Sequence, residues 1–422
     1  MWKYQAMNPS TTTQPPRRIL IFSFAYYPRF VGGAEVAIKE ITDRIDPSKM
    51  AFDLVTLRLD RNLPAVEKVG NVTVYRVGLS TKRSPKVSPD SLPWYLHLNK
   101  YFFLWTGWRR AAALHRANHY DAIWSLMASY SSFAAIIFKL THPTVPFVFT
   151  LQDGDPIPYI EHRARPLWPL FRRMFTKADH VQAISKYLAD WARQMGATCP
   201  VTVIPNAVDY ELFTAAPSPA ESRALRAKLT KGPEDVFLVT TSRLVVKNAI
   251  GDVIEAMKYL PANIKFLVLG QGYQLDELKK LSLRLGLNYT DEPPWNPGNR
   301  VHFLGYVPHR GMPPYLHVSD IFIRPSRSEG LGNSFLEAMA AGVPVIATPV
   351  GGIPDFLIEG ETGLFCEIGN PRSIAQKVEK LLKDREARSY LVSRARTMVR
   401  ERYRWEGVAG EMQNIFSAVV VK

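Results

Sequence analysis

The sequence predicts an α/β protein made of two doubly wound parallel sheets, and three observations support this. The length of 422 residues suits two domains of roughly 200 residues each. Short apolar runs alternate with segments of helical spacing. The alternation pauses in the Ala-, Pro- and Ser-rich stretch 206–222 and then starts again, which indicates a second domain facing the first.

The first domain opens with RRILIFSFAYYP (17–28), an apolar run bounded by charges and a proline, as in a strand buried on both faces. A helix is expected over 32–45, where apolar residues recur at helical spacing. Further short runs predict strands at 52–57, 120–125, 145–151, 180–185 and 201–206, with helices such as 130–140 and 187–196 between several of them.

The second domain repeats the pattern without repeating the sequence. Strands are expected at 235–244, 264–272, 301–307, 321–326 and 343–352, and helices at 250–260 and 275–285. The chain is therefore divided into a loose polar leader (1–16), a first domain (17–210), a second domain (211–402) and a helical end (403–422).

Composition fits a folded protein, with 46% hydrophobic and 22% charged residues. Of the net charge of +15, residues 1–211 carry +10, from 26 basic and 16 acidic residues. This excess favours an anionic partner, either a membrane surface, a phosphorylated substrate or nucleic acid, or else marks a generally basic protein. Two cysteines form no disulfide framework, which favours the cytoplasm. The opening residues 1–18 contain no apolar core of signal-peptide length, and no apolar run is long enough to span a membrane.

The stretch SRSEGLGNSFLEAMAAG (326–342) predicts a glycine-rich loop between a strand and a helix that ends at Gly342. The backbone N–H groups of Gly332, Asn333 and Ser334 would point out of the helix start, where the helix dipole favours negative charge. The stretch therefore predicts a phosphate site at the carboxyl edge of the second sheet.

Two glutamates flank this loop. Glu329 lies in the loop itself, and a carboxylate there suits paired sugar hydroxyls because it accepts two hydrogen bonds at once. For Glu337 an alternative stays open, since Ser334 and Glu337 have the spacing of a capping box, which stabilises a helix without any ligand.

Arg243 and Lys247 follow the strand expected at 235–244, so they also stand at a carboxyl edge. Two cations there could stabilise a diphosphate leaving group, although a solvated pair on a surface loop has the same pattern. In the first domain, Gly33 belongs to a glycine pair between strand and helix, which a tight turn explains equally well. The stretch LGQG (269–272) lacks the third glycine of a dinucleotide fingerprint.

The strand at 145–151 is followed by Gln152, Asp153 and Asp155. Asp153 is the best polar candidate to reach across the cleft, while Asp155 precedes a proline and fits a turn. The nine His and two Cys have no zinc spacing, so no structural metal is expected. The phosphate-binding loop of nucleotide triphosphatases is also absent.

The block RPSRSEGLGNSFLEAMAAGVPVIATPVGGIPDFLIEGETGLF (324–365) resembles the signature of the retaining glycosyltransferases of family 4, whose E-x7-E motif corresponds here to Glu329 and Glu337. PRFVGGAE (28–35), VIPNAVDYELF (203–213) and SRLVVKN (242–248) resemble other landmarks of that family, and the resemblance spans about residues 17–420. It implies a GT-B fold of two Rossmann-like domains, and transfer of an α-linked sugar from a nucleotide sugar with retention and without a required metal or other cofactor.

The resemblance also implies roles for individual residues. Arg243 and Lys247 would hold the donor diphosphate, Glu329 the hydroxyls of the donor sugar and Glu337 the ribose. The backbone at Leu331, Gly332 and Asn333 would meet sugar and phosphate, Gly33 would approach the phosphate from the first domain, and Tyr306 lies where the base-binding strand ends. The final helix (403–422) would cross back onto the first domain.

Three departures from the family pattern concern the site. Lysine follows arginine by four positions rather than five, so that Asn248 takes the other place. Gln152 stands where the family often has a histidine, and Ala207 replaces a common glycine. The mechanism expected from the resemblance is front-face departure of the diphosphate, whose oxygen helps to deprotonate the incoming hydroxyl.

The first domain is expected to bind the acceptor, a glycan, a glycolipid or a lipid-linked sugar. Segments 92–116 and 165–177 mix aromatic and basic residues, among them Trp94, Trp105 and Arg109, as in proteins that touch the inner face of the plasma membrane. Ordinary core aromatics on helices with a solvated basic face are the alternative.

Rival functions are an oxidoreductase, a phosphorylase-like enzyme, a sensor that binds UDP- or GDP-sugars without turnover, and a nucleic-acid-binding protein. The incomplete glycine fingerprint argues against an oxidoreductase. A missing pyridoxal phosphate absorbance would exclude a phosphorylase-like enzyme, and nucleic-acid binding is supported by charge alone.

Overall fold

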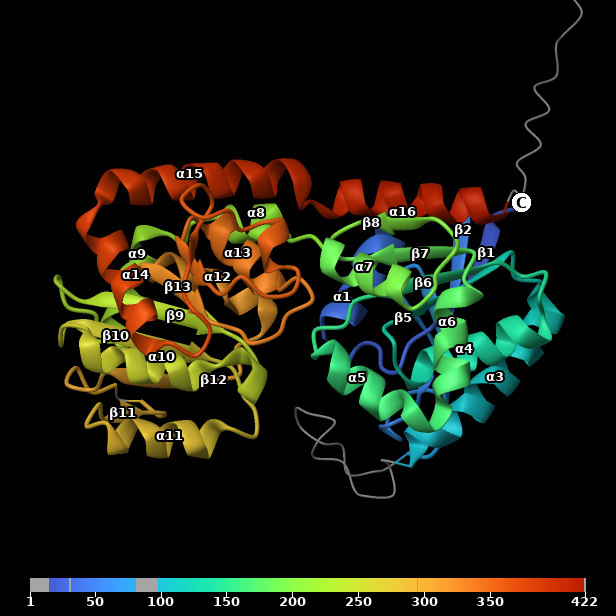
Figure 1. The fold of residues 1–422 in the computed structure, drawn as a ribbon, viewed down its shortest axis with the longest axis horizontal. Coiled ribbons are helices and arrows are strands. Elements are labelled where there is room, and N and C mark those ends of the chain that lie inside the picture. The colour runs from blue at the N-terminus through green and yellow to red at the C-terminus, as the bar shows by residue number, and fades with distance from the viewer. Residues whose placement is uncertain (1–14, 30–31, 81–97, 294, 421–422) are drawn as a thin grey trace, which may run out of the picture.

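The computed structural model describes residues 15–29, 32–80, 98–293 and 295–420. Two α/β domains lie side by side along the long axis of the molecule, each with a central sheet between layers of helices (Figure 1). The predicted fold class, two doubly wound sheets, is confirmed. Most of the predicted leader (1–16) and the whole of Trp94 lie outside the described residues.

The first sheet has eight strands in the order β3-β4-β2-β1-β5-β6-β7-β8. Its strands are β1 (Arg17–Phe22), β2 (Met50–Leu57), β3 (Val66–Val69), β4 (Val72–Val77), β5 (Ala122–Leu126), β6 (Phe147–Leu151), β7 (His180–Ala183) and β8 (Val201–Val203). All pairs are parallel except β3 with β4. In β1, Ile19 and Ile21 face one buried cluster while Leu20 and Phe22 face another, so helices cover both faces of this strand.

The second sheet has seven strands in the order β11-β12-β10-β9-β13-β14-β15, all parallel. They are β9 (Val236–Thr241), β10 (Ile264–Leu269), β11 (Tyr289–Thr290), β12 (Val301–Gly305), β13 (Ile321–Arg324), β14 (Val345–Ala347) and β15 (Leu364–Phe365). Every residue of β10, β13 and β14 is buried, including the cations Lys265 in β10 and Arg324 at the end of β13. The order reverses direction between β9 and β13, and ligands of such sheets bind at that point beyond the carboxyl ends.

Helices connect the strands and form the outer layers. Those before β9 are α1 (Gly33–Arg44), α3 (Asn99–Asn118), α4 (Tyr130–Thr141), α5 (Ile157–Ala164), α6 (Trp168–Thr176), α7 (Lys186–Gln194), α8 (Tyr210–Thr214) and α9 (Pro219–Lys228). Of these, α8 and α9 pack on helices of the second domain. Those of the second half are α10 (Ile250–Ala256), α11 (Leu275–Arg284), α12 (Pro313–His317), α13 (Asn333–Ala341), α14 (Pro371–Lys383), α15 (Arg385–Arg402) and α16 (Trp405–Val420). Short 3-10 turns lie at η2 (Arg165–Leu167), η3 (Val246–Asn248), η4 (Met257–Tyr259), η5 (His309–Gly311) and η6 (Ile353–Asp355).

The end of the chain returns to the first domain. After α15 lies along the second domain, α16 continues over the first and packs against α1 (Figure 1). The buried face of α16 includes Trp405, Met412 and Phe416, and the Phe416 ring meets those of Phe52 and Trp124 edge-on. The last helix is therefore part of the core of the first domain.

Candidate active site

The predicted site residues follow strands whose carboxyl ends face the other domain. Ser328, in the loop after β13, donates a hydrogen bond from Oγ to the carbonyl of Gly154, in the loop after β6 (3.2 Å). The Nζ atom of Lys247 forms an ion pair with Oδ1 of Asp155 (3.0 Å). Loops from both domains thus meet at one place, and the Asp155 carboxylate, a turn residue by sequence, contributes a contact between domains.

Helix α13 begins at Asn333, after Gly332 in a left-handed conformation (φ 91°), and ends at Gly342 (φ 78°). A Cβ atom at Gly332 would lie 2.7 Å from the Arg324 guanidinium and 2.6 Å from the Phe335 ring, so only glycine fits. Within the described part of the chain, no hydrogen bond is found to the backbone N–H of Asn333 or Ser334. These two half-buried groups remain available to an anion.

The capping-box alternative for Glu337 is wrong. The helix has no side-chain cap: Ser334 Oγ accepts instead from Nη1 of Arg324 (2.7 Å), and Oε1 of Glu337 contacts Nε2 of His309 (2.9 Å). The hydrogen bond to Glu337 is the main cause that raises the pKa of His309 above its ordinary value, against the opposing effect of burial. The buried Glu337 carboxylate therefore faces η5 and the site rather than its own helix start.

Arg324, the last residue of β13, is a site residue that the sequence reasoning missed. Its Nη2 atom pairs with Oε2 of Glu329 (2.7 Å), and its guanidinium lies over the Phe335 ring at 4.2 Å from the centroid. Burial lowers the pKa of Arg324, an effect that Glu329 opposes most strongly. The signal was present, because a basic residue ends the otherwise apolar run IFIR and needs a buried partner.

Glu329 is held rather than free. Besides its ion pair with Arg324, its Oε1 atom accepts from the backbone N–H of Gly330 (3.2 Å), and its side chain is 14% exposed. A carboxylate has about four acceptor positions, so this one could still accept hydrogen bonds from a ligand.

Arg243 and Lys247 flank the turn after β9. Arg243 is exposed, and its guanidinium has no hydrogen bond or ion pair to any described residue. Asn248 is buried and donates from Nδ2 to the Arg243 carbonyl (2.7 Å), which shapes the shorter Arg–Lys spacing of this chain. The structure brings Lys247 to the first domain through Asp155, whereas the Arg243 guanidinium has no partner among the described residues.

The expectation that the Asp153 side chain reaches across the cleft is wrong. Both of its carboxylate oxygens accept from the backbone N–H of Ala128 (3.2 and 3.0 Å), in its own domain. Burial raises the pKa of Asp153 from 3.8 to about 6, with a smaller contribution from Asp155. The part of Asp153 that meets the second domain is its backbone carbonyl, which lies against Gly330.

Gln152 donates from Nε2 to Oδ1 of the buried Asn206 (3.2 Å), whereas its buried Oε1 atom has no hydrogen-bond partner. Gln152 occupies the position where the family often has a histidine. Its role on the acceptor side of the site stays a prediction.

The remaining residues predicted to contact the donor are Gly33, Tyr306 and Leu331, and they differ in how exposed they are. Gly33 is the first residue of α1, and a Cβ atom there would meet nothing within 4 Å. Tyr306 directly follows β12 and is 61% exposed, without a hydrogen bond to any described residue. The Leu331 side chain is buried in the core, so only its backbone could meet a ligand.

The basic and aromatic segments behave differently from each other. In α6, Phe171, Met174 and Phe175 are buried, so the segment 165–177 is an ordinary amphipathic helix, as the alternative stated. In α3, Tyr101, Phe102 and Trp105 are each more than half exposed. Among the described helices none is long and apolar enough to cross a membrane, and no three described His, Cys, Asp or Glu side chains gather as a metal site.

Comparisons with known proteins agree with this arrangement. The sequence model of the group 1 glycosyl transferases matches residues 221–398, and that of Glycosyltransferase Family 4 matches residues 31–212. An uncharacterized glycosyltransferase of Methanocaldococcus jannaschii is 26% identical over 94% of this chain and 97% of its own length. The N-acetyl-alpha-D-glucosaminyl L-malate synthase of Bacillus anthracis is 32% identical over 60% of this chain and 62% of its own length.

A third relative is the GDP-mannose-dependent alpha-(1-6)-phosphatidylinositol monomannoside mannosyltransferase of Mycobacterium tuberculosis, 29% identical over 58% of this chain and 63% of its own length. The chain thus spans less than two thirds of the length of these two bacterial relatives.

Solved structures show the same fold. Sucrose-phosphate synthase of Thermosynechococcus elongatus superposes with a TM-score of 0.77 at 20% identity, covering 96% of this chain and 99% of that one. Anabaena HepE, crystallised with UDP and glucose, gives 0.73 at 20% identity, covering 95% and 100%. The two family models, which together match most of the chain, and the two-sheet fold support a GT-B glycosyltransferase that is similar to family 4.

Proposed function

We propose that the protein moves a hexose-type sugar from a UDP- or GDP-sugar to an acceptor hydroxyl with retention of configuration. The observation that carries the proposal is the unpaired Arg243 guanidinium near Lys247 and the free N–H groups opening α13, with buried Arg324 beneath them. Such an excess of donors is stable only when an anion or water fills it. A nucleotide diphosphate supplies that anion.

The remaining polar groups suit the other parts of the donor. Glu329, oriented by Arg324, would accept from the hydroxyls of the sugar, and Glu337 from the ribose. The exposed ring of Tyr306 offers a stacking surface for the base. Gly33, in the first domain, has no side chain and open space beside it, so its backbone can approach the phosphate of the donor.

Catalysis would consist of stabilising the departing diphosphate. As the sugar–oxygen bond breaks, negative charge grows on the leaving oxygen, and Arg243, Lys247 and the α13 N–H groups are the donors placed to receive it. That oxygen would take the proton of the attacking hydroxyl on the same face, which retains the configuration. We propose that these groups do this without a metal or another cofactor.

The role of Arg243 has a direct test. A charge-assisted contact is worth about 1.5–3 kcal/mol, so Arg243→Ala should lower turnover at least tenfold. Arg327→Ala is the matched control: Arg327 is also exposed in the second domain but pairs with Asp252 (3.0 Å). Near-normal turnover of Arg243→Ala would remove this side chain from the mechanism.

On the acceptor side, we propose a glycan, glycolipid or lipid-linked acceptor, reached from the cytoplasm. The mycobacterial relative acts, by its name, on a phosphatidylinositol mannoside. On α3, the rings of Tyr101, Phe102 and Trp105 are exposed. Lys100 lies over the Tyr101 ring and Arg109 over the Trp105 ring, a composition that suits an anionic membrane surface. Flotation with liposomes containing phosphatidylglycerol tests the membrane contact, and protein left at the bottom of the gradient would refute it.

Donor and outcome are tested together. Thermal-shift screening against UDP-, GDP- and ADP-sugars identifies the nucleotide, because stabilisation rises with occupancy. With the best donor, proton NMR of the product reports the anomeric configuration. Binding without any turnover, across simple sugar and lipid-linked acceptors, would favour the non-catalytic sensor instead.

A further inference from the structure

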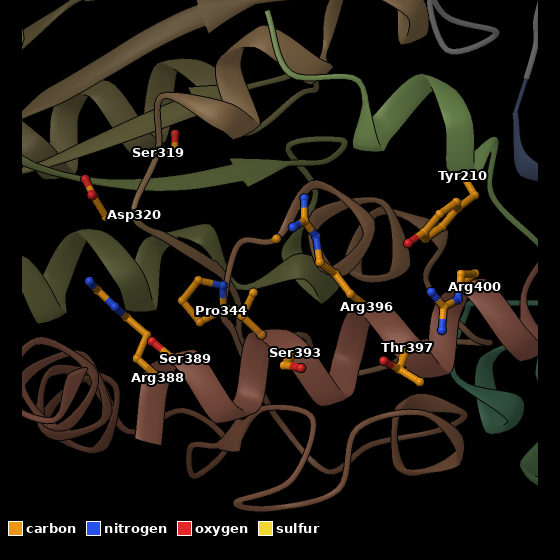
Figure 2. A pocket seen from close by; sticks show the side chains of 12 residues that line it. Tyr210, Ser319, Asp320, Pro344, Arg388, Ser389, Ser393, Arg396, Thr397 and Arg400 are labelled. Atoms are coloured by element: carbon orange, nitrogen blue, oxygen red, sulfur yellow. The ribbon is translucent and has the colours of Figure 1, made fainter. Parts of the chain in front are cut away.

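A groove of about 570 Å³ lies on the second domain away from the candidate active site. Its walls are α15 on one side and, on the other, Ser319 and Asp320 before β13 and Pro344 before β14 (Figure 2). These positions are the amino ends of the strands, whereas the donor loops follow the carboxyl ends. The groove is therefore a separate place on the surface, and its volume is that of a small-molecule site.

One face of α15 supplies most of the lining. Arg388, Arg396 and Arg400 project from it toward the groove, with the hydroxyls of Ser389, Ser393 and Thr397 beside them (Figure 2). These residues recur at intervals of four along the helix, which is the spacing that places side chains on one face. Arg396 and Arg400 start about 6 Å apart along the axis, and Arg388 about 12 Å before Arg396.

The cationic groups of the groove are poorly neutralised. Arg388 has no ion pair or side-chain hydrogen bond to any described residue, and Arg400 has only a 3.8 Å contact with its neighbour Glu401. Arg396 donates from Nε to the Ala340 carbonyl (3.1 Å) and from Nη2 to that of Ala341 (3.4 Å), so it keeps its charge while it covers the end of α13.

The one acid of the lining does not offset this charge. Asp320 Oδ2 already accepts from Nζ of Lys231 (2.6 Å) and from the backbone N–H of Phe237 (2.8 Å). The hydroxyls of Ser389, Ser393 and Thr397 have no hydrogen bond to any described residue. A groove with these hydroxyls, three guanidinium groups and one committed carboxylate is complementary to an anion that also carries hydroxyl groups.

We propose that this groove binds a phosphorylated sugar, at a second site distinct from the donor site. The phosphate lies between Arg396 and Arg400. Arg400 presents paired N–H donors to its oxygens, and Arg396 presents its Nη1 group, since its Nε and Nη2 atoms already bond carbonyls of α13. The sugar hydroxyls contact Ser389, Ser393 and Thr397, and Arg388 contacts the end of the sugar opposite the phosphate. Phosphate rather than carboxylate is favoured because three cations surround the site and phosphate carries nearly two charges at neutral pH.

Isothermal titration of the full chain with glucose 6-phosphate tests the proposal, with glucose and inorganic phosphate as comparison ligands. Arg388→Ala combined with Arg400→Ala should weaken glucose 6-phosphate binding at least tenfold. Lys383→Ala combined with Arg394→Ala removes the same charge outside the groove and should leave binding within twofold of the unaltered protein. So should Arg243→Ala combined with Lys247→Ala, which acts at the donor site.

The outcomes separate the alternatives. Binding unchanged in the groove variant, or lost in the donor-site variant, would overturn the proposal. Equal affinity for inorganic phosphate would refute a sugar site and leave a simple anion site, and equal affinity for glucose would refute a role for charge. Because Arg388 has no side-chain partner among the described residues and Arg400 has only the 3.8 Å contact with Glu401, melting temperature and UDP binding should be unchanged in the groove variant, which excludes misfolding as the cause.

Discussion

Arg324 organises the candidate site from beneath. Its guanidinium bridges Glu329 in the loop and Ser334 in the first turn of α13, so a single buried side chain sets the distance between the sugar-facing carboxylate and the phosphate-facing helix start. Its charge also adds to the field at that helix start. A group that acts through Glu329 in this way is a positioning residue, since the guanidinium itself is buried behind the loop.

Arg324→Met should lower kcat at least tenfold while the KM for the donor changes less, because the diphosphate contacts remain but the carboxylate loses its orientation. Arg324→Lys keeps the charge without the bridging geometry and should recover part of kcat. Steady-state kinetics of both variants, with Arg300→Met as control, checks this. Arg300 also donates to backbone carbonyls, those of Leu260, Pro261 and Ile264, but outside the site. Equal losses of kcat in Arg300→Met and Arg324→Met would reduce Arg324 to a stabilising residue.

Asp153 gives a second prediction at this scale, in the pH dependence of stability. Its pKa is about 6 in the folded protein against an ordinary value of 3.8, so the protonated carboxyl favours the folded state and that contribution is lost as pH rises from about 4 to 6. Asp153→Asn can still accept from the Ala128 N–H and has no charge to bury. It should match the unaltered protein at pH 4 and exceed it at pH 8 by on the order of 2–3 kcal/mol in unfolding free energy.

Chemical denaturation at both pH values measures this difference. A stability difference that is the same at pH 4 and pH 8 would show that the buried charge of Asp153 is not its cause.

At the scale of elements, the loop between β13 and α13 is fixed by glycines that admit other backbone segments. A Cβ atom at Gly330 would lie 2.4 Å from the Asp153 carbonyl of the other domain, closer than any real contact. Gly330→Ala should therefore push the loop away from the β6–α5 connection and lower kcat/KM for the donor more than tenfold, with little change in melting temperature. Gly410→Ala is the matched control, since α16 is open at that position and alanine there favours the helix.

Some features of these elements could be predicted from the sequence, and others could not. Buried strands and the α13 loop were predictable because each depends on a local pattern: β13 on a continuous apolar run, Gly332 and Gly342 on the ends of one helix. The hairpin of β3 and β4 was missed, although Gly70 with Asn71 between two alternating runs is a recognised turn signal. The orientation of Asp153 and the partner of Glu337 depend on Ala128 and His309, which lie 25 and 28 residues away, and no local pattern encodes them.

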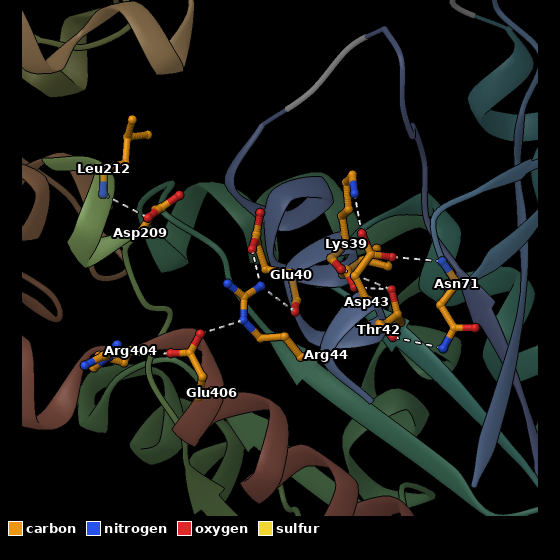
Figure 3. A network of polar contacts seen from close by, with 11 residues as sticks. Lys39, Glu40, Thr42, Asp43, Arg44, Asn71, Asp209, Leu212, Arg404 and Glu406 are labelled. Atoms are coloured by element: carbon orange, nitrogen blue, oxygen red, sulfur yellow. Dashed lines mark hydrogen bonds and ion pairs between the residues drawn. The ribbon is translucent and has the colours of Figure 1, made fainter. Parts of the chain in front are cut away.

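At the scale of the whole molecule, the chain ties its two domains together at both ends of the interface. On one side Arg44 of α1 pairs with Glu406 of α16 (3.1 Å), and Glu406 also pairs with Arg404 just before that helix (3.5 Å, Figure 3). Arg404 in turn pairs with Glu211 of α8, which packs on α13 of the second domain. On the other side, in the cleft, Lys247 pairs with Asp155. The second contact differs from the first because it uses a residue that we assign to the donor diphosphate.

Asp155 therefore competes with the donor for Lys247. The pair is partly exposed, with side-chain exposures of 17% for Lys247 and 48% for Asp155, so breaking it costs about 0.5–1 kcal/mol. Asp155→Asn should accordingly tighten nucleotide binding about two- to fivefold, whereas Lys247→Ala should weaken it and Glu211→Gln, which alters the other side of the interface, should leave it unchanged. Titration calorimetry with UDP or GDP measures all three. Weaker binding in Asp155→Asn would mean that Asp155 helps to orient Lys247 for the diphosphate, and the idea of competition would then fail.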